Sequence, residues 1–172
     1  MSKLAFIFPG QGAQKAGMGK DFYENSEAAR SFFDQAQKIL DFDLKEMCFG
    51  EHEELNLTEY TQPCMVSVCL AIVQELKKRG ITPDITAGLS LGEYAAVAAA
   101  GGMNELDAIK LVRRRGILMQ STVPAGEGAM AAVLGLDAKK IEEILESFEN
   151  VWIANYNCPG QIVITGEEGA VA

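Results

Sequence analysis

The sequence predicts an α/β fold in which a mostly parallel sheet carries helices on both faces and is interrupted by a smaller second unit. Leu4–Phe8 is a short apolar run that ends at Pro9 and Gly10, which is typical of a central parallel strand buried on both faces. Ile85–Ala87 is a second short buried strand, and helical patterning lies between the two. After residue 125 the order of elements becomes strand, helix, strand, strand.

The first part of the chain contains several expected helices. Ser26–Leu40 has a helical composition. A clearer helix opens at Thr61–Pro63, because proline suits a first helical turn, and it ends before Gly80. Asn104 can cap a further helix that runs to Gln120. The helix that opens at Thr61–Pro63 has one apolar stripe, formed by Val66, Cys69, Leu70, Val73 and Leu76.

The second part of the chain has the pattern of an incomplete ferredoxin-like unit, whose full order is β-α-β-β-α-β. Asp137 caps its expected helix, and Asn157–Gly160 supply turn residues. The expected strands are Ala129–Leu134, Val151–Tyr156 and Gln161–Thr165. We therefore divide the chain into a core at residues 1–125 and the start of this subdomain at 126–172. Since no closing helix and strand follow, one face of the small sheet is expected to lie bare.

Composition limits the function. The chain has 172 residues, of which 48% are hydrophobic and 23% charged, as in soluble globular proteins. The net charge of -9 argues against nucleic-acid binding. No apolar run approaches the ~20 residues of a membrane span, and Leu4–Phe8 is too short for the core of a signal peptide. Four cysteines without C-x-x-C spacing and a single histidine, His52, argue against a metal site. We expect a cytoplasmic protein with reduced thiols.

Gly88–Gly92 is a G-x-S-x-G motif centred on Ser90. A predicted strand precedes it and a predicted helix, Glu93–Ala98, follows it, which is the context of a nucleophile elbow. Glycines suit a turn in which backbone passes close to backbone. The start of the helix would stabilise negative charge on a substrate oxygen. Ser90 is therefore the candidate nucleophile, and a structural Gly-Ser turn is the alternative.

Further segments turn this elbow into a specific resemblance. Phe8–Gln14 follows the first strand, and Tyr60–Pro63, Arg113–Gln120 and Asn155–Gln161 come in order along the chain. Together with Gly88–Tyr94, these segments closely resemble malonyl-CoA:acyl-carrier-protein transacylases of fatty-acid synthesis. The resemblance runs from the N-terminus to the last residue and implies an α/β-hydrolase-like core with an inserted ferredoxin-like subdomain.

The resemblance also implies a reaction. Ser90 would take the malonyl group from a coenzyme A thioester, which is a substrate and not a bound cofactor, and the phosphopantetheine thiol of acyl carrier protein would then accept it. The backbone N–H of Leu91 follows the nucleophile at a helix start and is one natural oxyanion donor. The backbone N–H of Gln11 is the second donor in this family.

Arg115 has the clearest expected substrate role. It lies directly before Gly116, as the substrate arginine of the family does, and a guanidinium can hold the free carboxylate of a malonyl group through two parallel hydrogen bonds. A solvated helix face is the alternative, and it suits at least one of the neighbours Arg113 and Arg114. Gln62 is expected to line the pocket beside the ester. Asn157 matches the subdomain motif of the family, although asparagine is also a common turn residue.

Two basic clusters, Lys77–Arg79 and Lys110–Arg114, stand in this acidic chain. A local basic patch would steer the anionic carrier protein and coenzyme A phosphates. For Lys77–Arg79 the alternative is an ordinary helix end with the favoured dipole sign.

The sequence departs from the family in two ways. The family uses a histidine far downstream of the serine as its general base, and no histidine follows Ser90 here, while His52 matches no family motif and is expected at the surface. Leu89 stands where many relatives carry histidine. We therefore interpret the chain as the N-terminal piece of a longer transacylase, poorly stable alone because apolar surface would face water.

Other functions remain possible on these residues. A serine thioesterase or esterase of α/β-hydrolase type would share the elbow, but it needs neither Arg115 nor the Gly10–Gln14 loop. A non-catalytic fragment could bind carrier protein without any acylation of Ser90. An acyltransferase domain cut from a polyketide synthase is a third alternative, and Met1 directly before the first strand favours a free-standing protein instead.

Overall fold

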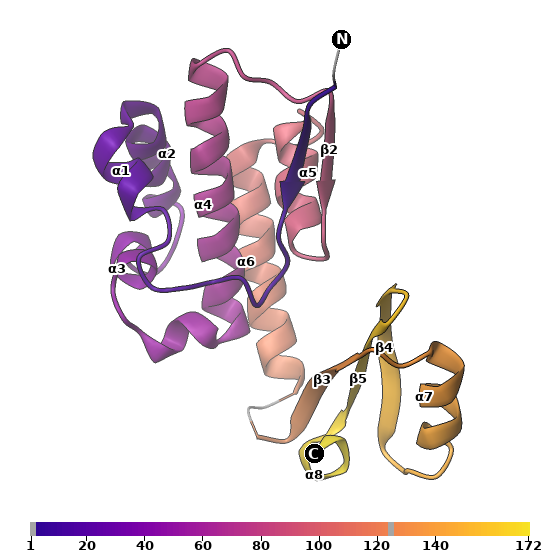
Figure 1. Ribbon diagram of the computed structural model, residues 1–172. Helices are drawn as coiled ribbons and strands as arrows, with labels where there is room; N and C mark the ends of the chain where they lie inside the picture. Colours follow the sequence, from indigo (N-terminus) through magenta and orange to yellow (C-terminus); the bar gives the residue numbers. More distant parts are fainter. Residues whose placement is uncertain (1–2, 124–125) are drawn as a thin grey trace. The chain divides into compact units, whose positions relative to one another are not determined.

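The computed structural model describes residues 3–123 and 126–172 and forms two compact units, Met1–Gln120 (unit 1) and Ser121–Ala172 (unit 2) (Figure 1). The boundary expected at residue 125 lies outside the described residues. The elements of unit 1 are β1 (Ala5–Phe8), α1 (Lys20–Asn25), α2 (Glu27–Gln37), α3 (Leu44–Phe49), the 3-10 helix η1 (Glu53–Asn56), α4 (Thr58–Lys78), β2 (Ile85–Gly88), α5 (Gly92–Ala99) and α6 (Glu105–Thr122), whose last residues enter unit 2. Those of unit 2 are β3 (Gly128–Leu134), α7 (Ala138–Leu145), β4 (Val151–Cys158), β5 (Gln161–Glu167) and α8 (Glu168–Val171).

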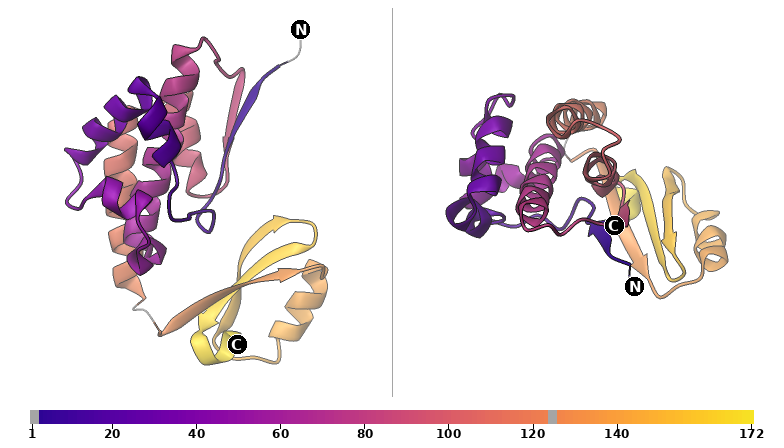
Figure 2. Two further views of the ribbon diagram at one scale, coloured as in Figure 1. Left: turned by 60° about the vertical axis from the view of Figure 1, so that its left-hand side comes forward. Right: turned by 90° about the horizontal axis from the view of Figure 1, so that it is seen from above.

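The strands β1 and β2 form a parallel pair in unit 1, with Phe6 beside Thr86 and Phe8 beside Gly88. The helices of unit 1 lie on one side of this pair (Figure 2). Phe6 and Phe8 point to that side and are buried, whereas Ile7 between them is 78% exposed. The α/β prediction is confirmed at this level, but in the described residues helices cover only one face of the pair.

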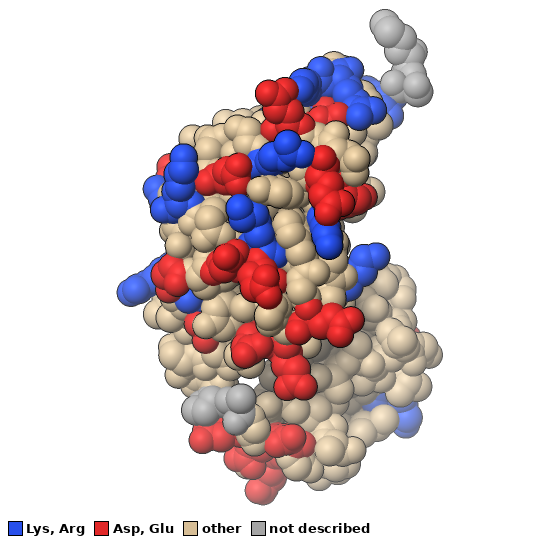
Figure 3. Space-filling model, turned by 90° about the vertical axis from the view of Figure 1, so that its left-hand side faces the viewer, with Lys and Arg blue, Asp and Glu red and all other residues tan. Residues whose placement is uncertain are grey.

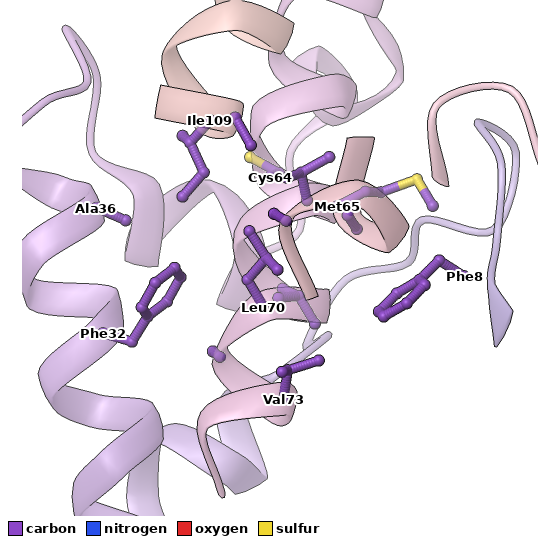
Figure 4. Packing of buried hydrophobic residues seen from close by; sticks show 14 of the residues in the cluster. Phe8, Phe32, Ala36, Cys64, Met65, Leu70, Val73 and Ile109 are labelled. Carbon is purple, nitrogen blue, oxygen red and sulfur yellow. The ribbon is translucent and has the colours of Figure 1, made fainter. Parts of the chain in front are cut away.

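The core of unit 1 is built around α4. Figure 4 shows this helix with side chains of the other elements around it, among them Phe32 of α2, Ile109 of α6 and Phe8 of β1, which belong to the same core cluster as Cys64 and Leu70. The prediction gave α4 a single apolar stripe, but every residue of Thr61–Val68 is buried. The helix is central because α2, α5 and η1 all pack against it. Its polar residues Thr61, Gln62 and Ser67 are therefore buried as well.

The helix α4 begins at Thr58, so the predicted start at Thr61 is wrong by three residues. Pro63 therefore lies inside the helix and not in its first turn. Proline has no N–H, and the carbonyl of Glu59 one turn earlier loses its usual helical donor. The guanidinium Nη1 of Arg113 donates to that carbonyl at 2.8 Å. A distant residue thus supplies the donor that Pro63 cannot.

The short helices α1 and α3 are not apparent in the sequence pattern. Each has only six residues, too few to show a helical period. Asp43 caps α3 by accepting hydrogen bonds from the amides of Lys45 and Glu46. Both helices pack their aromatic side chains onto Phe33 of α2, so tertiary packing stabilises them more than local propensity does.

Unit 2 is a three-stranded antiparallel sheet in the order β3-β5-β4, and α7 connects its two outer strands (Figure 1). Ile141 of α7 is buried together with Val151 and Ile162, so the helix covers one face. Met130 and Trp152 flank Thr165 in the ladder and are 62% and 60% exposed. Within the described residues of unit 2 no helix covers the second face, as the pattern of strands predicts.

Residues 3–123 and 126–172 contain neither a candidate membrane-spanning helix nor a candidate metal cluster. No helix there has the length and apolar character needed to cross a bilayer. No group of three or more His, Cys, Asp or Glu side chains in these ranges is arranged to hold a metal ion.

Candidate active site

The turn between β2 and α5 has the geometry of a nucleophile elbow. Ser90 sits at its tip with a φ of 49°, a left-handed conformation that is costly for a residue other than glycine. Three backbone hydrogen bonds hold the turn: Leu89 N to Phe8 O at 3.1 Å, Gly92 N to Leu89 O at 2.9 Å and Glu93 N to Ser90 O at 3.1 Å. The serine side chain is exposed. The surrounding structure thus holds a strained serine where a substrate can reach it.

Close backbone contacts explain both glycines of the motif. A Cβ added to Gly88 would lie 2.1 Å from the carbonyl carbon of Gly92. A Cβ added to Gly92 would lie 2.3 Å from the carbonyl oxygen of Phe8. Atoms cannot approach so closely, and backbone cannot move aside as a flexible side chain does. Only glycine at both positions lets α5 start directly against β1 and β2.

The two amides expected to bind an oxyanion are both available. Leu91 is the N-terminal cap residue of α5, and within the described residues its amide has no acceptor. Gln11 lies in the exposed loop after β1, and its amide likewise has no acceptor in that part of the chain. The loop passes against the elbow, since a Cβ on Gly10 would be 2.9 Å from the carbonyl oxygen of Leu89. The loop of Gln11 and the elbow therefore adjoin each other.

The side chain of Gln11 is held by α4. Its Nε2 donates to Thr58 Oγ1 at 3.0 Å, and Gln62 Nε2 lies 3.4 Å from its Oε1. The Thr58 amide in turn donates to Gln120 Oε1 at 3.1 Å. Gln62 is fully buried, also contacts Met119 Sδ, and keeps an unpartnered Oε1. In this arrangement Gln62 orients the loop rather than presenting its amide to solvent.

Arg115 projects from α6 toward the helix that follows the elbow. Its guanidinium carbon lies 5.6 Å from the ring centroid of Tyr94, which stands one turn after Ser90. No carboxylate pairs with Arg115 within residues 3–123 and 126–172. A partly buried guanidinium without an internal counter-ion can accept a carboxylate from outside.

The other basic residues are mostly neutralised by partners. On the face drawn in Figure 3, lysines and arginines lie among aspartates and glutamates. The carboxylates that pair with the two basic clusters belong to Glu27, Asp41, Glu59, Glu75, Glu105 and Asp107. Opposite charges paired at this distance carry little net field. This favours ordinary paired helix ends over a steering patch.

Asn157 lies in unit 2, near the end of β4. Its side chain is exposed, and its Nδ2 lies 3.4 Å from Oε1 of Gln161 across the hairpin. This contact belongs to the hairpin itself.

His52 is engaged with a carboxylate. Its Nε2 lies 3.1 Å from Glu46 Oε1, and its side chain is 31% exposed. The ring also packs on Gly50, where a Cβ would lie 2.5 Å from Nε2. The residue is therefore half-buried in local contacts rather than fully at the surface.

The buried thiols are poor alternatives to Ser90 as a nucleophile. A side-chain hydrogen bond with Cys48, together with burial, raises the pKa of the Cys64 thiol. Burial raises the pKa of Cys69 to about 11. A thiol nucleophile must ionise, so the raised pKa values of Cys64 and Cys69 disfavour either thiol as the nucleophile.

Sequence reasoning missed Thr58 and the structural role of Arg113. Thr58 stands at the start of α4, and the early boundary was hidden by Pro63. Arg113 lies in a run of three arginines, where nothing local distinguishes a buried, paired side chain from a solvated one. A signal for Thr58 was present, since a threonine before Glu59 and an apolar run is typical of a helix start.

Known proteins resemble this chain along nearly its whole length. The malonyl CoA-acyl carrier protein transacylase of Bacillus subtilis strain 168 is 50% identical over 171 residues, covering 96% of this chain and 54% of that protein. The crystal structure of malonyl CoA-acyl carrier protein transacylase from Clostridium perfringens superposes with a TM-score of 0.89 at 45% identity, covering 99% of this chain and 55% of the other. A malonyl-transacylase solved in complex with a type II PKS acyl-carrier protein gives 0.88 at 40% identity, covering 99% and 57%.

The chain thus spans about half the length of the curated relatives it matches. Residues 5–172 match the family described as acyl transferase domain. That range contains the elbow, the loop of Gln11 and the helix of Arg115. The chain belongs to the acyl transferase domain family.

Proposed function

We propose that this protein moves a malonyl group from coenzyme A to the phosphopantetheine thiol of acyl carrier protein, through an ester on Ser90, in fatty-acid biosynthesis. The strained, exposed conformation of Ser90 within an acyl transferase domain is the observation that carries the proposal. The names of the relatives, malonyl CoA-acyl carrier protein transacylases, support the choice of donor and acceptor.

In the first half-reaction Ser90 Oγ attacks the thioester carbonyl of malonyl-CoA. The Oγ–C bond forms, the C–S bond breaks, and the proton lost by the serine ends on the sulfur of coenzyme A. The amides of Gln11 and Leu91 donate to the oxygen that becomes negative in between. Each such donor contributes about 3 kcal/mol to transition-state stabilisation. In the second half-reaction the thiol of the carrier protein attacks the ester, and its proton returns to Ser90 Oγ.

Arg115 binds the free carboxylate of the malonyl group. Its lack of an internal carboxylate partner within the described residues supports this role, and the planar guanidinium matches a carboxylate through two hydrogen bonds. Gln62 acts beside the ester by holding the side chain of Gln11. Asn157 is proposed as a further substrate contact, supplied by the subdomain.

The general base is proposed to lie outside these 172 residues. No histidine follows Ser90, and His52 is committed to Glu46. The matched relatives are almost twice as long as this chain, which leaves ample sequence for such a residue. A serine nucleophile needs a base to accept its proton, so activity is expected of the protein in that longer form.

The finer fold is part of the same proposal. The pair β1 and β2 belongs to an α/β-hydrolase-like, mostly parallel sheet, and the exposed side of Ile7 is where further elements pack. The order β3-β5-β4 with α7 supports an incomplete ferredoxin-like subdomain. The protein works in the cytoplasm with coenzyme A thioesters as substrates and without a resident cofactor, a nucleic acid or a membrane.

Intact mass spectrometry of the protein from its natural host, before and after brief exposure to malonyl-CoA, tests the proposal. We expect one added malonyl group that maps to Ser90, its transfer to holo carrier protein, and no addition to a Ser90→Ala variant. Free malonate released in the absence of a thiol would indicate a thioesterase instead. Saturable binding of carrier protein without acylation would indicate a non-catalytic protein.

A further inference from the structure

We propose that Arg113 is a positioning residue that fixes the placement of α6, and with it the direction of Arg115, without touching the substrate. The inference rests on the proposed function, because Arg115 is the residue that holds the malonyl carboxylate there. Arg113 and Arg115 stand two residues apart on the same helix and therefore point to different sides of it.

Arg113 is the most heavily engaged arginine of the described residues. Its Nε and Nη2 donate to the two carboxylate oxygens of Asp41 at 2.9 and 3.0 Å. Its Nη1 donates to the Glu59 carbonyl oxygen at 2.8 Å and to Glu59 Oε2 at 3.1 Å. The guanidinium carbon lies 5.2 Å from the ring centroid of Phe42 and 5.0 Å from that of Tyr60, and the side chain is only 12% exposed. These contacts hold it in one orientation.

The contact with the Glu59 carbonyl also fixes the position of α6 along the axis of α4. A helix interior offers no free carbonyl, because each accepts from the amide four residues later. Pro63 lacks that amide, so Glu59 is the one acceptor that this proline frees. Arg113 can satisfy it only when α6 stands at one position along α4. Pro63 and Arg113 together therefore set the axial register between α4 and α6.

Gly116 supplies a second fixed point, three residues further along the same face of α6. A Cβ there would lie 2.8 Å from both the carbonyl oxygen of Thr58 and the Cα of Glu59. Two contacts on one face fix both the axial position and the rotation of α6. Arg115 lies between them on another side, with its guanidinium over Tyr94 near the elbow. Its direction follows from the anchors and not from its own contacts alone.

Lysine cannot replace Arg113 in this arrangement. One ammonium cannot reach both oxygens of Asp41 and the Glu59 carbonyl in the planar pattern that a guanidinium makes. An Arg113→Lys variant keeps the charge but loses the guanidinium hydrogen bonds that set the register between α4 and α6. Misplacement of a substrate-holding group by about 1 Å can cost about a hundredfold in rate, so a loss that is specific to the carboxylate-bearing substrate is expected.

The test compares acylation of Ser90 by malonyl-CoA and by acetyl-CoA, which lacks the carboxylate, using the protein as its natural host makes it. In Arg113→Lys we expect the malonyl-to-acetyl ratio to fall by about ten- to a hundredfold, with acetylation nearly unchanged and a raised KM for malonyl-CoA. Arg114→Lys is the matched control, because Arg114 is exposed and has no ion pair among the described residues. It should leave the ratio unchanged.

Each other outcome is decisive. An unchanged ratio in Arg113→Lys, or an equal loss of both acylations, would overturn the positioning role while the proposed function stands. No acylation of the unmodified protein would instead defeat the proposed function itself. Should Arg113→Lys fail to fold, Pro63→Ala supplies an amide that competes with Arg113 for the Glu59 carbonyl, and it must still lower the ratio. An unchanged ratio in that variant also refutes the inference.

Discussion

Within the described residues, each unit contains one non-glycine residue with a left-handed backbone, Ser90 in unit 1 and Asn150 in unit 2, and the surroundings of the two residues differ. Ser90 is held by backbone hydrogen bonds and by glycines that permit close approach on both sides. Asn150 is also held by backbone, since its carbonyl oxygen accepts from the amide of Glu167 and Gly166 lies close against it. Asparagine, however, tolerates a φ of this sign, and its Nδ2 also donates to Glu167. Backbone strain at a residue type that does not favour a positive φ, such as Ser90, indicates a functional position.

The cores of the units explain why only unit 1 can hold such strain. Unit 1 surrounds α4 on nearly every side, with fully buried side chains that include Phe33 and Leu70. Among the described residues of unit 2, only Ile141, Val151 and Ile162 are buried hydrophobics. A small core contributes little stability to offset local strain. The turn of Ser90 therefore belongs to the unit with the larger core.

The largest effect is expected from Gly88→Ala, which tests how tightly the elbow is enclosed. The added Cβ would meet the backbone of Gly92 at 2.1 Å, so we expect a loss of about 3 kcal/mol or more in the free energy of unfolding. Urea unfolding measures it. The control is Gly169→Ala in α8, where a Cβ meets nothing within 4 Å and no loss is expected. Equal stability of both variants would mean that the turn is not enclosed as described.

An effect of similar or smaller size, confined to unit 2, is expected from Ile162→Ala. It removes one of the few buried side chains there and should cost about 2 to 4 kcal/mol. Hydrogen exchange should show faster opening of β3, β4 and β5 while α4 stays protected. Trp152→Thr on the uncovered face should change stability by less than about 0.5 kcal/mol. A large loss from Trp152→Thr would show that another part of the protein covers this face.

Ser90→Gly should raise stability by about 1 kcal/mol, because glycine adopts a φ of 49° without strain. The same variant cannot be acylated. Asn150→Gly is the comparison, and it should give no gain, since it relieves little strain and removes the bond to Glu167. Thermal unfolding of the two variants measures the difference. No gain in Ser90→Gly would mean that the elbow stores no strain.

The last prediction concerns the hydrogen bonds to the carboxylate of Glu75 in unit 1. Hydrogen bonds from Ser26 and Arg79 hold the pKa of Glu75 below its ordinary value of 4.5, with Lys78 adding to the effect. A pKa lowered by folding gives stability that is present above 4.5 and lost as the pH falls through the folded value. Glu75→Gln should therefore be less stable than the unmodified protein at neutral pH. Urea unfolding at decreasing pH should show that this gap closes below 4.5; a constant gap would contradict the assignment.

Local patterns alone were enough for much of the site. The apolar runs predict β1 and β2, and the G-x-S-x-G motif between a strand and a helix predicts the elbow around Ser90. Asn104 and Asp137 cap helices as their positions predict, each accepting from amides at the helix start. These features depend on contacts within a few residues, so the sequence carries them directly.

Only the tertiary structure decided the rest, because the deciding contacts join residues far apart in the chain. Pro63 lies inside α4, and Arg113, 50 positions later, donates to the Glu59 carbonyl that this proline leaves without a helical donor. Gln62 is enclosed because Gln11 and Met119 meet around it. A run of three arginines looks uniform in sequence, yet packing pairs Arg113 with carboxylates and places the guanidinium of Arg115 over the ring of Tyr94. The local sequence pattern thus specifies the strand, turn and helix of the elbow, and long-range packing specifies which distant residues contact one another.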